Sequence, residues 1–330
     1  VTDTVAIAFV VTSDRLAAVD LPVTGSALAT DLDFVRGTLA PPPSAARGSA
    51  WRVPLSRLRA QLVAPIEATG LLREKRRLLI VPHRELHYLP FAALLEGGSG
   101  GQFLIERYEI GYVSSAAVWL KLMARVSRPG TAGVLAIAPR AAHDLPGASA
   151  EVAAIARIYG TDATVLTGDR ATRRALMDAA PGHSVIHLAT RGVLNKHNPL
   201  FSFVALAPSA GSDGRLEVHD LASLRLHASL VVLSACQTAL GSGRVIDVPP
   251  GDDWVGLVQA FQLAGAATVL ATLWPVDDQA TAQVMKRFYN ELRAGKTAAE
   301  ALTSAQRSAL NAPGSRSPFY WAGFVLDGSL

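Results

Sequence analysis

Apolar positions along the chain fall into two kinds of segment that alternate from about residue 78 onward. Short apolar runs, such as 78–81 and 230–233, are bounded by proline or polar residues, as buried parallel strands are. Strands are predicted at 4–11, 16–23, 78–81, 109–113, 133–138, 163–166, 184–189, 203–207, 230–234, 268–273 and 321–326. Helices are predicted at 27–39, 115–126, 148–159, 171–179, 218–224, 254–264, 278–293 and 298–310, with a further helix that starts at Pro54 and ends before Gly70.

This alternation predicts an α/β fold. Strands separated by helical segments of about 10–15 residues favour βαβ units, and therefore a mostly parallel sheet with helices on both faces. Two helix starts are well marked: Thr297 and Glu300 form a capping box, and Asp277 with Asp278 places carboxylates at the positive end of a helix.

Composition narrows the class of protein. With 330 residues, 50% of them hydrophobic and 18% charged, the chain is too apolar to be disordered. Its length allows one large domain or two halves that share a core. The apolar stretch 257–274 contains polar residues, is interrupted at Gly265 and is followed by Pro275. This pattern predicts a buried helix followed by a buried strand, so no membrane span is expected. The N-terminal residues lack the features of a secretory signal, and a cytoplasmic location is therefore expected.

Several kinds of ligand are not predicted. The net charge is only +4, and no basic run with interleaved aromatics points to nucleic acid. The glycine-rich segments 97–101 and 241–243 lack phosphate-binding spacing. One cysteine, Cys236, allows neither an internal disulfide nor a multi-cysteine zinc site. No cofactor or metal is expected.

The same cysteine is the leading candidate for chemistry. Cys236 follows the predicted strand 230–234, and ligands of parallel sheets bind just beyond the carboxyl ends of strands. The alternative is a small hydrophobic side chain in the core. A second predicted strand, 184–189, contains His187 and is followed by Arg191. If the two strands are neighbours, Arg191 and Cys236 meet at one edge of the sheet.

Motifs spread over most of the chain resemble the CHAT domain family. They are HLATRG at 187–192, NPLFS at 198–202, LVVLSACQT at 230–238, AFQLAGAATVLATLWPVDD at 260–278 and MKRFYNEL at 285–292, with LLIVPHRELHYLPFAALL at 78–95 and LIERYEIGYVSSAAVW at 104–119 upstream. The resemblance implies a caspase-like three-layer sandwich, related to separases and gingipains. Residues 1–130 would form a degenerate half and residues 131–330 the half of active type.

The resemblance implies a cysteine endopeptidase. Members of the family are often fused behind TPR or other sensor repeats, and some act in bacterial defence by cleaving a partner protein. The resemblance therefore implies a protein or peptide substrate and TPR-like regulatory repeats as partners, without direct binding of nucleic acid or membrane.

The resemblance also assigns the site residues, with one departure. The nucleophile corresponds to Cys236, and the family's general base is the histidine of a His-Gly pair that reads Arg191-Gly192 here. Arginine stays protonated and has no acceptor atom, so Arg191 cannot serve as the base. Its charge would instead favour the thiolate. The backbone amides of Gly192 and Cys236 are the expected oxyanion hole.

Two other histidines are candidates for supporting roles. His187 lies four residues before Arg191, about 13 Å away along a strand, so it cannot take that place. It is expected to be a hydrogen-bonded core histidine or one that supports the site. His197 precedes Asn198 in a loop, where it could fold back as a substitute base or stay exposed.

Substrate selection is open at this stage. Asp252 and Asp253 lie after the nucleophile strand and either form an acidic pocket for an arginine or lysine side chain or cap the helix predicted from Trp254. Trp274 and Trp321 either line a cleft or fill the core.

Two functions fit these residues. One is a cysteine endopeptidase weakened by Arg191, whether that arginine is a tolerated variant or an introduced change. The other is a pseudo-peptidase that serves as a protein-interaction module.

Overall fold

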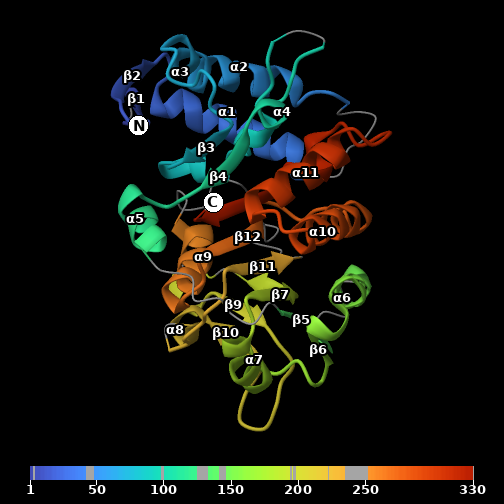
Figure 1. The fold of residues 1–330 in the computed structure, drawn as a ribbon. Coiled ribbons are helices and arrows are strands. Elements are labelled where there is room, and N and C mark those ends of the chain that lie inside the picture. The colour runs from blue at the N-terminus through green and yellow to red at the C-terminus, as the bar shows by residue number, and fades with distance from the viewer. Residues whose placement is uncertain are drawn as a thin grey trace.

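An eight-stranded sheet forms the centre of the molecule (Figure 1). The computed structural model describes residues 1–2, 4–41, 48–97, 100–124, 133–140, 146–193, 195, 198–221, 223–234 and 252–329, with 146 and 252–255 described by backbone alone. The strands across the sheet are, in order, β3 (Arg77–Ile80), β4 (Glu109–Tyr112), β13 (Phe324–Gly328), β12 (Thr268–Thr272), β11 (Leu230–Ser234), β7 (Val185–Ala189), β5 (Val134–Pro139) and β6 (Ala163–Gly168).

The sheet is mostly parallel, as the alternating pattern predicts. Every neighbouring pair is parallel except β12 and β13, which are antiparallel. Strands β3, β4 and β13 therefore run opposite to the five strands from β12 to β6. The predicted α/β class is confirmed, with a reversal of direction between β13 and β12.

Helices cover both faces of the sheet (Figure 1). One face packs against α6 (Pro146–Tyr159), α10 (Asp278–Arg293) and α11 (Ala298–Leu310); the other packs against α7 (Arg173–Ala179), α8 (Val218–Leu221) and α9 (Asp252–Ala264). Side chains of β11 alternate between the two cores: Leu230 and Val232 join the first, and Val231 and Leu233 the second.

The marked helix starts form as expected. Asp277 accepts a hydrogen bond from the Ala280 backbone N–H at 2.9 Å and so caps α10. Thr297 and Glu300 form the capping box of α11, with the Thr297 N–H donating to Glu300 at 2.9 Å. These caps fix the entry of two helices that cover the sheet.

A small unit of strands and helices precedes the sheet and lies at the top of Figure 1. It contains the antiparallel pair β1 (Ala6–Val11) and β2 (Leu16–Leu21), followed by α1 (Gly25–Leu39), α2 (Arg52–Leu62) and α3 (Ala64–Ala68). The predicted single helix from Pro54 is wrong in detail. It begins at Arg52 and divides before Pro65, since proline has no N–H to continue the hydrogen-bond ladder.

Several shorter elements complete the fold. Helices α4 (Leu104–Arg107) and α5 (Ala116–Ala124) flank β4. Short 3-10 helices lie at Arg84–Tyr88, Phe91–Ala93, Gly160–Asp162, Ala180–Gly182, Pro199–Phe201 and Pro318–Tyr320.

A separate three-stranded antiparallel sheet contains the predicted strand 203–207. It consists of β8 (Gly192–Val193), β9 (Phe203–Ala205) and β10 (Arg215–Glu217), with β9 in the middle. The expectation that residues 203–207 join the parallel sheet is wrong. The nine residues between β8 and β9 are fewer than the dozen or so that a parallel crossover needs.

The apolar stretch 257–274 divides between α9 and β12, as predicted. Within the described residues, no helix combines the length and the apolar character needed to cross a bilayer. The main sheet is continuous across residue 130 because β4 pairs with β13 at Tyr112 and Asp327. The division into halves at that residue stays a prediction.

Candidate active site

The two strands that lead to the candidate residues are neighbours in the main sheet. β7 and β11 are parallel over their whole length, and their last residues, Ala189 and Ser234, lie opposite each other. The next backbone N–H, that of Thr190, donates to the Ser234 carbonyl at 3.3 Å. The two predicted strands are therefore neighbours, and both end at the same edge of the sheet.

The segment that follows β7 is held by the small sheet. The Thr190 hydroxyl donates to the Ala205 carbonyl at 2.6 Å, and the Ala205 N–H donates to the Arg191 carbonyl at 2.9 Å. Gly192 is buried and lies opposite Val204, while the Arg191 side chain is half-buried. This pairing fixes the backbone at Arg191, the position that the resemblance assigns to the general base.

Other predicted site residues lie wholly or partly outside the described residues. Cys236 and His197 are among the residues that the structure does not describe. Asp252 and Asp253 open α9, two residues earlier than the start predicted at Trp254, and only their backbone is described. Their assigned roles stay predictions.

A buried polar network lies directly beneath the strand ends. The His187 Nδ1 atom and the Tyr289 hydroxyl are 2.8 Å apart. The Ser234 hydroxyl donates to both carboxyl oxygens of Glu151, at 2.7 and 2.8 Å. The His187 Nε2 atom lies 3.5 Å from Glu151 Oε1 without a hydrogen bond, so the two pairs are adjacent.

Strand geometry brings these residues together. His187 and Ser234 point to the face covered by α6 and α10, because alternate residues of a strand share a face. Glu151 comes from α6 and Tyr289 from α10, and all four side chains are buried. The network thus ties the ends of β7 and β11 to the helices above them.

With this geometry in place, a family model described as the CHAT domain matches residues 52–329. The chain belongs to the CHAT domain family. This CHAT domain is 28% identical over 343 aligned positions to Tetratricopeptide repeat protein 28 of Mus musculus, which covers 86% of the chain and 13% of the relative. The human protein of the same name is also 28% identical. The chain therefore spans only 13% of the length of these relatives.

Solved structures with the same fold include a separase and an Arg-specific cysteine proteinase. The Saccharomyces cerevisiae separase of a separase–securin complex superposes with a TM-score of 0.51 at 14% identity, covering 74% of this chain and 15% of separase. The Arg-specific cysteine proteinase gingipain R, from Porphyromonas gingivalis, superposes with a TM-score of 0.51 at 9% identity, covering 92% and 74%. The predicted caspase-like fold is confirmed.

Burial sets the charge states in the network of the CHAT domain. It raises the pKa of Glu151 to about 7; the Asp278 carboxylate adds to this increase, and the hydrogen bond from Ser234 opposes it. Burial lowers the pKa of His187 to about 3 and raises that of Tyr289 well above 10. His187 and Tyr289 are therefore neutral at neutral pH, and Glu151 changes charge there.

A cavity of about 20 Å³ lies against Glu151. Asp278 and Thr281 of α10 and Gly147 of α6 line it. These helix starts follow β12 and β5, so the cavity is on the strand-exit side of the sheet. Its volume is enough for one water molecule.

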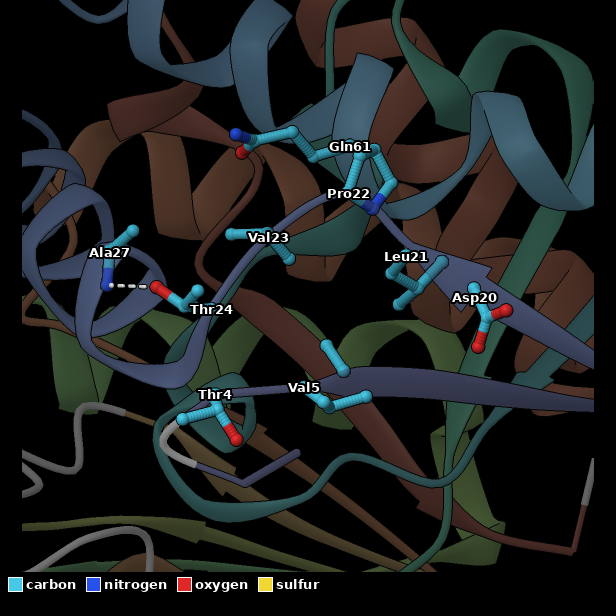
Figure 2. A pocket seen from close by; sticks show the side chains of 10 residues that line it. Thr4, Val5, Asp20, Leu21, Pro22, Val23, Thr24, Ala27 and Gln61 are labelled. Carbon is cyan, nitrogen blue, oxygen red and sulfur yellow. Dashed lines mark hydrogen bonds between the residues drawn. The ribbon is translucent and has the colours of Figure 1, made fainter.

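A larger cavity, of about 460 Å³, lies in the N-terminal unit, apart from β7 and β11 (Figure 1), and Figure 2 shows its lining residues. Residues of β1, β2 and the loop before α1 line it, together with Gln61 of α2. In Figure 2 the Thr24 hydroxyl accepts a hydrogen bond from the Ala27 N–H at 3.3 Å, which caps α1. The Gln61 Oε1 atom is buried without a hydrogen-bond partner among the described residues, and none of the lining residues belongs to the network around Glu151.

One group among the described residues has the ligand types of a metal site: Glu217, His219 and Asp220. Asp220 already accepts a hydrogen bond from Arg173 at 2.7 Å and another from the Glu217 backbone N–H at 3.1 Å. Through these hydrogen bonds, Asp220 of α8 holds β10 and α7 together, which explains why the three side chains lie close to one another.

Sequence reasoning missed Glu151, although a signal was present. Ala148, Val152, Ile155 and Tyr159 form the apolar stripe of α6, and Glu151 lies three residues after Ala148 on that stripe. A carboxylate on the buried side of a helix indicates a polar partner in the core.

Trp274 and Trp321 lie in the core rather than in a cleft.

Proposed function

We propose that this CHAT domain is a cysteine endopeptidase that cleaves a partner protein and is weakened by Arg191. The observation that supports it most strongly is the pairing of β7 with β11, since it brings Arg191 and the segment leading to Cys236 to one edge of a caspase-like sheet. The Cys236 thiolate attacks the scissile carbonyl, and the backbone amides of Gly192 and Cys236 receive the oxyanion.

Arg191 can meet one requirement of this reaction, formation of the thiolate, but not a second, transfer of a proton to the leaving amine. A guanidinium near the thiol favours the thiolate and lowers the pKa of the cysteine below the usual value of about 8.5. The same group cannot pass a proton to the leaving amine, because it has no acceptor atom and does not release its proton. Loss of a positioned proton donor lowers the rate by about 10²–10⁴-fold. The protein is therefore expected to alkylate readily and to cleave peptides slowly.

The test compares three forms of the protein on a peptide library: the chain as it is, Arg191→His, and Arg191→His combined with Cys236→Ala. We expect the histidine to raise the cleavage rate by about 10²–10⁴-fold and the second substitution to abolish it. If Arg191→His yields no cleavage that depends on Cys236, the peptidase proposal is wrong. Fast cleavage by the unmodified chain would contradict the role given to Arg191.

A pseudo-peptidase is the second candidate, and the arginine at the position of the base supports it. In that case the domain binds a protein partner without cleaving it. The relatives carry tetratricopeptide repeats by name, and the chain spans a small part of them. We infer that helical repeats of this type, in the same polypeptide or in a partner, regulate the domain. Retention of partner binding by a Cys236→Ala variant, with no cleavage in the restored form, is the result expected of this alternative.

A further inference from the structure

Thr190 follows β7 directly and is bound to both sheets of the molecule. Its backbone N–H donates to the Ser234 carbonyl of β11 at 3.3 Å, and its hydroxyl donates to the Ala205 carbonyl of β9 at 2.6 Å. The residue is fully buried. Thr190 therefore connects the central sheet to the small sheet immediately before the position that the resemblance assigns to the general base.

The backbone of Arg191 is held on both sides. Thr190 precedes it, and the Ala205 N–H donates to the Arg191 carbonyl at 2.9 Å. The next residue, Gly192, lies opposite Val204 in the small sheet. Because the backbone atoms on either side of a Cα atom set the direction of its Cα–Cβ bond, the side chain at position 191 leaves the chain in one direction. What remains free to vary is its rotamer.

One of the hydrogen bonds named above is made by a side chain, that of Thr190. The others join backbone atoms, so a substitution does not remove them. Threonine is branched at Cβ and has few χ1 rotamers, so its hydroxyl loses little freedom when it binds the Ala205 carbonyl. The Thr190 hydroxyl is therefore the part of this arrangement that depends on the residue type.

We propose that Thr190 is a positioning residue for the side chain at position 191. Its hydroxyl, bound to the Ala205 carbonyl, sets the direction in which that side chain leaves the end of β7. In this protein the side chain is that of Arg191, whose Nε atom is buried. The inference rests on the proposed function for its catalytic consequence, since a histidine introduced at position 191 would be oriented by the same hydroxyl. The orientation itself involves only residues that the structure describes.

The Arg191 Nε–H group provides a readout that needs neither a substrate nor cleavage. In nitrogen-15-labelled protein, its NMR signal is the guanidinium signal that disappears in Arg191→Lys. We expect this proton to exchange slowly with water in the unmodified chain, because the Nε atom is buried. Thr190→Val keeps the shape but lacks the hydroxyl, and should speed the exchange by about five- to hundredfold. Thr190→Ser restores the hydroxyl and should restore slow exchange.

Thr268→Val is the matched control. The Thr268 hydroxyl also donates to a backbone carbonyl at 2.6 Å, that of Ser329, and the residue is also buried. Thr268 opens β12, at the opposite end of the sheet from the strand exits. Its substitution removes a hydrogen bond of the same kind and should leave the exchange of the Arg191 Nε–H unchanged. A merely structural role for Thr190 would give both valine variants the same effect on this signal.

Cleavage by the form that carries Arg191→His measures the catalytic consequence. Addition of Thr190→Val should lower its kcat by up to about 100-fold and change KM little, because a shift of about 1 Å in a reacting group has an effect of that size. Addition of Thr190→Ser should leave most of the activity. Circular dichroism establishes that each variant is folded.

The two measurements separate this inference from the peptidase proposal. Fast exchange of the Arg191 Nε–H in the unmodified chain overturns the inference even if Thr190→Val does not fold. Equal exchange in Thr190→Val and in the unmodified chain overturns it as well, and leaves the peptidase proposal intact if Arg191→His cleaves. If Thr190→Val speeds the exchange but Arg191→His cleaves nothing, the inference holds and the peptidase proposal fails.

Discussion

At the scale of single residues, the network under the strand ends joins two side chains, Glu151 and His187, whose contributions to stability change in opposite directions with pH. The native state favours the proton on Glu151, so its contribution to stability is present below about pH 4.5 and is lost as the pH rises through 7. The native state disfavours a proton on His187, so stability is lost as the pH falls from about 6.5 toward 3. The two effects offset each other between about pH 4.5 and 6.5.

Tyr289 should be important for stability because it provides the hydrogen-bond partner of a buried ring nitrogen. Tyr289→Phe leaves the His187 Nδ1 atom without that partner and should lower the free energy of unfolding by about 1–3 kcal/mol. Urea denaturation at pH 7 measures the change. Tyr320→Phe, at a half-buried position, is the control and should change stability little; equal losses in both variants would contradict the assignment.

Asp327 gives a prediction of pH dependence away from the site. Burial raises its pKa to about 6. The native state therefore holds this proton more tightly, and its contribution to stability, complete below about pH 3.8, is lost as the pH rises through 6. Asp327→Asn still accepts the hydrogen bond from Gln262 and should become more stable than the unmodified chain by about 1–3 kcal/mol between pH 4 and 7. Thermal unfolding across that range checks it, and a constant difference at every pH would contradict it.

At the scale of elements, the bounds of helices and strands could be predicted from local sequence, but the pairing of the strands could not. β11, α10 and α11 were predicted with the observed bounds, because an apolar run or a cap marks each end. The two- and three-residue strands β8 and β10 are too short to leave a pattern. β9 was found but assigned to the wrong sheet, since both strands with which it pairs, β8 and β10, are too short to be recognised.

The site shows the same division. Both β7 and β11 could be recognised as strands because each is an apolar run that ends in polar residues. Their pairing could only be assumed from the sequence, and the structure shows it. Glu151 could not be linked to Ser234, 83 positions later, because nothing in either local sequence names its partner.

Helix α11 should secure the central strand β13 through one glutamine. The Gln306 side chain is buried and donates to the carbonyls of Trp321 and Phe324, at 2.8 and 3.0 Å. Gln306→Leu leaves both carbonyls without that donor and should destabilise the protein by about 2–4 kcal/mol. Chemical denaturation compares it with Gln283→Leu at an exposed position of α10, which should change stability by less than about 0.5 kcal/mol. Similar losses would show that Gln306 does not hold the strand.

At the scale of the whole molecule, the sheet joins the two predicted halves. The rings of Phe103 and Trp321 meet at 5.1 Å, and Arg307 donates to the Ile105 carbonyl at 2.7 Å. We therefore expect one unfolding transition, with coincident midpoints by tryptophan fluorescence and circular dichroism. Two separated transitions would mean that the halves unfold independently.

The position of β13 has a consequence for how the protein is made. This strand, the last of those described, lies between β4 and β12 and pairs with both. While the ribosome has not yet synthesised residues 324–328, β4 and β12 each present a bare edge, and domains of this size expose such edges to aggregation during folding. A chain that lacks residues 324–328 would thus lose only five residues but also the strand that joins β4 to β12, which makes it a target for cellular quality control.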